Sequence, residues 1–281
     1  MTRTALFLSP HLDDVAFSCG GLAALLHDRG WHTVLATAFT ATVMPATGFA
    51  LACQLDKGLS PDVDYMALRR VEDREAAAIL GFSELLHLDL PEAPHRGYTS
   101  ARALFGPLRD DDPIMPSLAA KLAHLQHAFA PDLVLVPQGL GAHVDHLQMV
   151  RAAYEALSTP IGWYRDTPYA IRHPDAHPQH TRHLAELQVP IGAALDRKLR
   201  AACAYSSQIG FQFGGPEQTS AALRDFARAE SGNNGFAERV MCSDQARSLL
   251  SSSHPIRGDC GDPQTLDRKR GVIRDRESRT L

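Results

Sequence analysis

The sequence contains neither a long hydrophobic run nor an excess of positive charge. No stretch approaches the ~20 consecutive apolar residues that a membrane-spanning helix requires. The formal net charge at pH 7 is -4, so the chain carries no strong positive field to attract nucleic acid or an anionic membrane. We therefore expect no membrane span and no nucleic-acid partner.

Cysteine is scarce, and its five copies are scattered without a C-x-x-C pair. An odd and dispersed set is typical of reduced thiols rather than of a disulfide framework. The apolar run at residues 5–8 is too short for the core of a signal peptide, and Pro10 follows it. These features predict a cytoplasmic protein. The cysteines are Cys19, Cys53, Cys203, Cys242 and Cys260.

The composition favours one folded domain followed by a polar tail. Hydrophobic residues make up 44% of the 281 residues and charged residues 21%, a balance typical of chains that bury a sizeable core. Residues 251–281 differ, because Ser, Arg and Asp are frequent there and large apolar side chains are few. We predict a single domain over residues 1–250 and a flexible tail over 251–281.

The first half of the chain alternates short apolar runs with segments of helical spacing. Strands separated by helices imply a mostly parallel sheet with right-handed crossovers, so we predict a Rossmann-like, doubly wound α/β fold of three layers, α/β/α. The second half is less regular and predicts a short strand near Trp163 and a helix at 190–204. Strands are predicted at 4–9, 32–39, 85–90 and 133–137, and helices at 20–29, 65–80 and 117–129.

The clearest amphipathic pattern lies at residues 65–80. Apolar residues recur there at helical spacing, and a glycine follows the last of them. We expect Met66, Val71, Ala78 and Ile79 to form the side of this helix that packs on the sheet.

Two polar segments follow two of the predicted strands. S-P-H-L-D-D at residues 9–14 comes directly after the strand at 4–9, and H-V-D-H at 143–146 comes shortly after the strand at 133–137. A doubly wound order places these two strands side by side where the winding reverses, and ligands bind there, beyond the carboxyl ends of the strands. The topology thus brings both segments into one crevice.

The residue types in these segments fit a catalytic metal site. Zinc accepts imidazole nitrogen and carboxylate oxygen, and two histidines with one carboxylate leave a coordination position for water. Metal binding lowers the pKa of that water to ~7. A second carboxylate can take the proton of the water, and a further histidine can stabilise an oxyanion or protonate a leaving amine. The two segments contain a candidate for each task.

The segments resemble A-H-P-D-D-E and H-x-D-H, the signatures of the PIG-L/LmbE-like deacetylase family. The likeness includes R-x-x-E at 69–72, W-Y-R-D-T-P-Y at 163–169, and Lys198 followed by Y-S-S-Q at 205–208, so it extends from residue 4 to about 210. It implies a zinc-dependent hydrolase, with Fe²⁺ as another possible metal. The implied reaction removes an N-acyl group, expected to be acetyl, from an amino sugar or an amino-sugar conjugate.

The resemblance also implies roles for individual residues. His11, Asp14 and His146 match the metal ligands of the family. Asp13 matches its general base, and His143 matches the residue that stabilises the oxyanion or acts as general acid.

Other positions extend or modify this pattern. Asp145 matches the carboxylate that orients and tunes the histidine pair beside it, which is a supporting catalytic role. Leu12 replaces the usual proline, and Val15 replaces the usual acidic residue. Arg165 stands where an acidic residue is common, so we expect it to change the charge preference of the substrate rim.

Several alternatives stay open at this point. Asp13 and Asp14 also suit a simple helix cap. A nucleotide-binding Rossmann domain is disfavoured, since G-x-G-x-x-G is absent. An amidase acting on a larger non-sugar or thiol conjugate, and a metal-binding protein without catalysis, are further candidates. His173 and His177 are interpreted as a solvated loop, because the prolines beside them disfavour a helix that would align them.

The substrate rim is expected to come from three loops. Polar side chains in these loops, such as Arg96, Tyr98 and His173, predict a polar rim without selecting one particular sugar. The loops are those at 41–64, 91–115 and 165–190.

Overall fold

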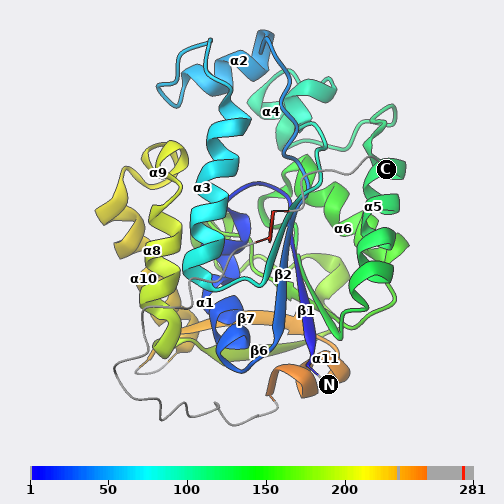
Figure 1. Cartoon of the computed structure of the whole chain (residues 1–281), viewed down its shortest axis with the longest axis vertical. Helices are drawn as coiled ribbons and strands as arrows, with labels where there is room; N and C mark the ends of the chain where they lie inside the picture. Colours follow the sequence, from blue (N-terminus) through cyan, green and yellow to red (C-terminus); the bar gives the residue numbers. More distant parts are fainter. Residues whose placement is uncertain (1, 233–234, 252–273, 276–281) are drawn as a thin grey trace.

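The computed structural model describes residues 2–232, 235–251 and 274–275 (Figure 1). The described strands form one sheet in the order β6-β7-β5-β4-β1-β2-β3-β8. Most of the predicted tail at 251–281 lies outside the described residues, so the proposed domain boundary stays a prediction. The strands are β1 (Thr4–Ser9), β2 (His32–Thr37), β3 (Glu84–His87), β4 (Leu133–Pro137), β5 (Ile161–Tyr164), β6 (Ala185–Pro190), β7 (Ala237–Cys242) and β8 (Arg274–Asp275).

Helices cover both faces of the sheet. Figure 1 shows α1, α3, α8 and α10 on one side and α5 and α6 on the other. Among the described residues, none of the helices has the length and hydropathy needed to cross a bilayer. The helices are α1 (Asp14–Asp28), α2 (Gly48–Leu55), α3 (Tyr65–Leu80), α4 (Ala101–Leu104), α5 (Ile114–Phe129), α6 (Val144–Ala156), α7 (Tyr169–Arg172), α8 (Leu195–Cys203), α9 (Ser206–Phe213), α10 (Pro216–Ser231) and α11 (Asp244–Ser251).

Strand β1 is apolar along its length because both of its faces are covered. Phe7 packs into the core beneath α1 and α3, whereas Leu6 and Leu8 point into the core beneath α5 and α6. All three side chains are fully buried. The strand therefore joins the two cores and fixes the position of the loop that follows it.

The topology confirms the predicted α/β class. β1 pairs in parallel with β2 on one side and with β4 on the other, which is the reversal point predicted for the winding. β7 runs antiparallel to both β5 and β6, so the sheet is mixed at this edge. The sequence analysis did not anticipate β6 and β7. β6 is largely exposed, and charged residues interrupt the apolar residues of β7.

Helix α3 matches its predicted bounds, but its predicted apolar side is only partly right. Met66 is buried and Ile79 packs against the core, as predicted, whereas the other two residues do not face inward. Val71 is 58% exposed and Ala78 is also exposed. The buried side includes three charged residues that find polar partners on neighbouring segments, so pairing rather than hydropathy decides which side faces inward. These residues are Arg69, Glu72 and Asp73.

Candidate active site

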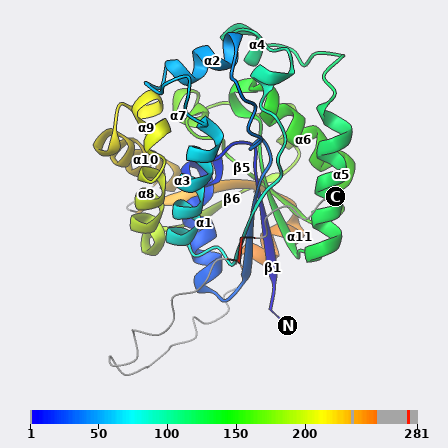
Figure 2. The ribbon, with the colours of Figure 1, turned by 45° about the horizontal axis from the view of Figure 1, so that its top comes forward.

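The loops after β1 and β4 meet beyond the carboxyl ends of the two strands (Figure 2). His11 comes from the first loop, while His143 and His146 come from the second loop and the first turn of α6. The ring of His11 lies 4.9 Å from the ring of His143 and 5.2 Å from that of His146, centroid to centroid. The structure therefore assembles both predicted segments into one cluster.

The carboxylate of Asp14 lies between two histidine nitrogens. Its Oδ2 is 3.3 Å from Nδ1 of His11 and 3.3 Å from Nε2 of His146. Ligand atoms placed ~2.0–2.1 Å from a tetrahedral zinc ion are themselves about 3.3 Å apart. Nε2 of His146 is buried and has no hydrogen-bond partner in the described chain. A buried nitrogen without a partner costs free energy, and a cation that accepts its lone pair would remove that cost. His11, Asp14 and His146 therefore fit a metal ion.

Carboxylates on the outer side fix both histidine rings. Nδ1 of His146 lies 2.6 Å from Oδ1 of Asp166, and Nε2 of His11 lies 3.0 Å from Oδ2 of Asp145. Each outer nitrogen can donate a proton to its carboxylate, so in the uncharged ring the nitrogen facing Asp14 has a free lone pair for a cation. Asp145 therefore orients His11, and not His146 of its own segment as expected. Asp166 performs that task for His146, and the W-Y-R-D segment was its signal in the sequence.

A buried arginine holds Asp145 in turn. Arg96 forms ion pairs with Oδ1 of Asp145 at 2.8 Å and with Oδ1 of Asp112 at 3.0 Å. Burial opposes ionisation of Asp145, but His11 and Arg96 hold its pKa well below the usual range. Tyr98 is also buried and donates its hydroxyl to Asp112. The prediction that Arg96 and Tyr98 lie on the substrate rim is therefore wrong, because both side chains are buried and hold the carboxylates that support the site.

Asp13 lies in the same cavity, beside the guanidinium of Arg69. Burial raises the pKa of Asp13 to about 7, although Arg69 at 3.5 Å opposes the rise. A bound cation would lower this pKa by stabilising the carboxylate. The position suits a base that takes a proton from a water molecule near the donor set, by which we mean His11, Asp14 and His146. The role of Asp13 as general base stays a prediction.

His143 is a neutral hydrogen-bond donor in this site. Its Nδ1 accepts the backbone N–H of Asp145 at 3.2 Å, so the ring proton resides on Nε2. Burial, reinforced by the nearby His11, lowers the pKa of His143 to about 3.

The nitrogens of His11, His143 and His146 also lie within 4.8 Å of one another, so a set of three histidines is the competing metal site. The two 3.3 Å distances from Asp14 favour the predicted set.

The R-x-x-E and Y-S-S-Q segments meet between α3 and α9. Glu72 accepts hydrogen bonds from the hydroxyls of Ser206 and Ser207 at 2.7 and 2.6 Å, and from the backbone N–H of Ser207 at 2.7 Å. The amide of Gln208 donates to the hydroxyl of Tyr65 at 2.9 Å. These bonds hold α9 against α3, where it forms one wall of the active-site cavity.

Lys198 stabilises a break in helix α1. The backbone leaves the helical conformation at Cys19, where φ is -131°. Glu238 accepts from the backbone N–H groups of Gly21 and Leu22, and Lys198 donates to Glu238 at 2.7 Å and to the carbonyl of Ser18 at 3.2 Å. The pair supplies partners for backbone groups that the break releases.

The active-site cavity has a volume of about 370 Å³. All three predicted loops contribute to its lining, and α9 adds a wall that the sequence analysis did not anticipate. His173 and His177 are exposed and do not line it, so the predicted solvated loop is confirmed and His173 does not belong to the rim. Polar side chains from the predicted loops do line the cavity, among them Thr42, Lys57 and Arg172, but the three residues named as examples do not.

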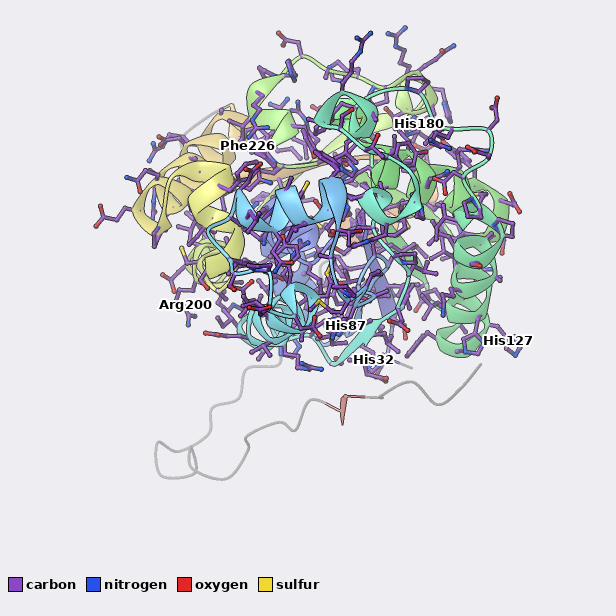
Figure 3. All side chains as sticks on the ribbon, turned by 90° about the horizontal axis from the view of Figure 1, so that it is seen from above. His32, His87, His127, His180, Arg200 and Phe226 are labelled. Atoms are coloured by element: carbon purple, nitrogen blue, oxygen red, sulfur yellow. The ribbon has the colours of Figure 1, made fainter. Side chains whose placement is uncertain are left out.

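Arg165 lies away from this cavity. Its guanidinium pairs with Glu230 at 2.6 Å and lies 5.7 Å from the ring of Phe226 on α10, near the edge of the molecule (Figure 3). The residue is buried and joins the end of β5 to α10. The expectation that it changes the charge of the substrate rim is therefore wrong.

The fold and the site together define a hydrolytic α/β enzyme with a donor set for a metal ion. The family model for PIG-L, GlcNAc-PI de-N-acetylase, matches residues 6–157. The chain belongs to this family of N-acetyl deacetylases. The match contains all six predicted site residues, which are His11, Asp13, Asp14, His143, Asp145 and His146.

Individual relatives agree with this assignment. The chain is 32% identical to 2'-N-acetylparomamine deacetylase of Streptomyces fradiae over 212 residues, which cover 72% of each protein. It is similar in structure to the zinc-inhibited form of teicoplanin deacetylase Orf2, with a TM-score of 0.74, 25% identity, and coverage of 86% and 99% of the two chains. For the A40926 pseudoaglycone deacetylase Dbv21 the TM-score is 0.73 at 25% identity, with coverage of 86% and 96%.

Proposed function

We propose that this protein is a zinc-dependent hydrolase that removes an N-acetyl group from an amino sugar within a larger conjugate. The observation that supports it most directly is the pair of 3.3 Å distances from Asp14 to His11 and His146, with Asp13 in the same cavity. The acetamido sugars named for its relatives supply the substrate class. The four described cysteines are free thiols, which supports the predicted cytoplasmic location.

His11, Asp14 and His146 would hold the zinc ion. The ion, when bound, supplies a Lewis acid for the acyl oxygen and lowers the pKa of a coordinated water. Fe²⁺ accepts the same imidazole and carboxylate donors. The donor set therefore supports a divalent metal, and metal analysis must decide between the two.

The remaining residues carry the proton transfers. A carboxylate oxygen of Asp13 accepts a proton from the attacking water, and the N–H at Nε2 of His143 donates a hydrogen bond to the oxygen that becomes negative. The protonated Asp13 then gives this proton to the nitrogen of the departing amine as the C–N bond breaks. Arg69 pairs with Glu92 at 2.7 Å, and both residues line the cavity beside Asp13. This donor and acceptor pair suits the hydroxyl groups of a sugar ring.

The test is a screen of N-acetylated amino sugars and their glycosides with zinc-loaded protein. We expect free amine and acetic acid in equal amounts, the acid being identified by mass spectrometry. Release of a larger acid would instead support an amidase acting on another conjugate. Metal bound without turnover of any compound would contradict the proposed catalysis.

The metal is tested with a matched pair of histidine variants. His146→Ala should lose bound metal, whereas His127→Ala, at an exposed position on α5 (Figure 3), should retain it. Metal content is measured by mass spectrometry after dialysis. Zinc is added from substoichiometric amounts upward, because one structural relative has been solved in a zinc-inhibited form. Equal metal content in both variants would contradict the proposed ligand set.

A further inference from the structure

Ser18 connects two parts of the donor set that come from different elements. It lies on α1 one turn after Asp14, so the two residues share a face of the helix. Its Oγ accepts the backbone N–H of Thr167 at 2.9 Å. Ser18 is 6% exposed, and Thr167 is fully buried. The helix that begins with Asp14 is therefore tied to the segment that follows β5.

Thr167 directly follows Asp166, the residue that orients His146. Oδ1 of Asp166 lies 2.6 Å from Nδ1 of His146, and Nε2 of the same ring lies 3.3 Å from Oδ2 of Asp14. The contacts therefore form a closed path, which we call the contact circuit. All of its residues are buried, so the contacts are shielded from solvent. The members of the contact circuit are Asp14, Ser18, Thr167, Asp166 and His146.

The carbonyl of Ser18 is held as well as its hydroxyl. Lys198 donates to this carbonyl at 3.2 Å and to Glu238 at 2.7 Å, and both of these side chains are almost fully buried. The helical conformation is interrupted at Cys19, so Ser18 is the last residue before the break in α1. Both polar groups of Ser18 thus have partners outside α1, and the first turn of the helix can shift only if one of these bonds breaks.

The third predicted ligand has a support of its own. Nε2 of His11 lies 3.0 Å from Oδ2 of Asp145, which does not belong to the contact circuit. The backbone N–H of His11 also donates to Oδ2 of Asp14 at 2.7 Å. This bond holds the carboxylate relative to the loop after β1, and not relative to His146. Opening the contact circuit should therefore loosen Asp14 relative to His146 and leave His11 in place.

We propose that Ser18 is a positioning residue that sets the distance between Asp14 and His146, and thereby the affinity of the site for its metal ion. The inference rests on the proposed function, which makes these two residues metal ligands. Without the hydroxyl, the buried N–H of Thr167 loses its acceptor, and a buried N–H without a partner is costly. The segment after β5 then shifts toward another acceptor, and Asp166 moves with it and turns the ring of His146.

The test compares two serines that each accept one backbone N–H. Ser83 accepts from Thr33 at 3.2 Å, near the start of β2 and so at the end of the sheet away from the site. Ser18→Ala should weaken zinc binding by about tenfold, because an outer contact of the ligands is lost. Ser83→Ala should bind zinc like the parent protein. Competition with a chelating dye gives the affinities, and urea denaturation gives the stability of both variants.

The possible results separate the inference from the proposed function. Equal zinc affinities in the parent protein and Ser18→Ala would overturn the inference alone. A similar loss of affinity in Ser18→Ala and Ser83→Ala would also overturn it, since the loss would then follow from stability. A parent protein that binds no metal would contradict the proposed function, and the inference with it.

A spectroscopic signature reports whether the ligands have moved. Cobalt(II) accepts the same donors as zinc, and its visible absorption depends on the arrangement of its ligands. Ser18→Ala saturated with cobalt should show a band that differs from that of the parent protein in position and intensity, because Asp14 and His146 no longer keep their spacing. Ser83→Ala should reproduce the parent spectrum. Identical spectra for Ser18→Ala and the parent protein would overturn the inference.

A double variant tests whether Ser18 acts through Asp166. Removal of either contact opens the contact circuit, so removal of the second contact should add little. In the Asp166→Asn protein, Ser18→Ala should therefore lower the zinc affinity by less than about threefold. A further loss as large as that of the single variant would show that Ser18 acts independently of Asp166, and would overturn the inference.

Discussion

Oδ1 of Asp166 lies 2.6 Å from Nδ1 of His146, and this contact fixes which nitrogen of the ring faces the metal donors. The carboxylate of Asp166 also accepts the backbone N–H groups of Gly139 and Leu140 at 3.2 Å each. Asp166, which follows β5, therefore orients His146 of α6 and also holds the loop that precedes α6. The donor set depends on a residue outside both signature segments.

Asp166→Asn should weaken metal binding by about 10–100-fold, because the amide no longer enforces the tautomer of His146. Competition with a chelating dye gives the affinity, and urea denaturation shows whether the fold persists. Asp175→Asn, at an exposed position on the following loop, is the control and should bind metal normally. An unchanged affinity in Asp166→Asn would remove the orienting role.

Asp13→Asn should retain metal and lose about 10²–10⁴-fold in kcat, since the amide cannot accept a proton from water. Metal content and kcat are measured on the same preparation. Loss of the metal together with the activity would point to a ligand rather than a base. Full turnover with bound metal would exclude Asp13 from proton transfer.

Arg96→Ala should destabilise the fold by about 3–5 kcal/mol, because it leaves two buried carboxylates without their cation. The side chains of Asp112 and Asp145 have no exposed surface. The free energy of unfolding is measured in urea. Arg200→Ala removes an exposed pair on α8 (Figure 3) and should leave stability nearly unchanged. Similar losses in both variants would contradict the buried role of Arg96.

Gly141→Ala should lower stability and kcat together. Gly141 has φ of +77°, and an added Cβ would lie 2.4 Å from Cδ1 of Tyr169, whose ring is 5.6 Å from that of His146. The left-handed backbone alone costs roughly 1–2 kcal/mol for alanine. Gly192→Ala, where nothing lies within 4 Å of the added Cβ, should be tolerated. Urea denaturation and steady-state rates check both, and wild-type behaviour of Gly141→Ala would show that the loop adapts.

Removal of the metal with a chelator should lower the Tm by on the order of 10 °C, because a ligand that binds the folded state stabilises it by mass action. Scanning calorimetry before and after chelation measures the shift. Addition of one equivalent of zinc should restore the Tm, whereas His146→Ala should show neither the loss nor the recovery. A Tm that does not respond to chelation would contradict a metal bound at this site.

Apolar pattern and strand order predicted the centre of the fold. β4 was predicted to the residue, and the pairing of β1 with β4 placed both signature segments together. Only part of the buried side of α3 could be predicted from hydropathy, because Arg69 and Glu72 also face inward, toward partners that are distant in sequence. The apolar pattern of the local sequence contains no information about such partners.

The supporting residues of the site were harder to predict than the donors. Arg96 and Tyr98 occur in a loop and are polar, which is typical of a rim, yet both are buried against Asp112. Asp166 was noticed without a role, because its partner His146 lies twenty residues away in another element. The exposed apolar residues that line the cavity were missed, since Met44, Phe105 and Phe211 come from three separate segments.

The break in α1 affects the order in which a nascent chain can finish its active site. The residues that would hold the metal have all been synthesised by His146, and Asp166 follows soon after. Glu238, which accepts the amides released at the break, leaves the ribosome about seventy residues later. Ribosome-bound chains that stop before β7 should therefore hold the metal loosely, and maturation of the site should wait for the last strand before α11.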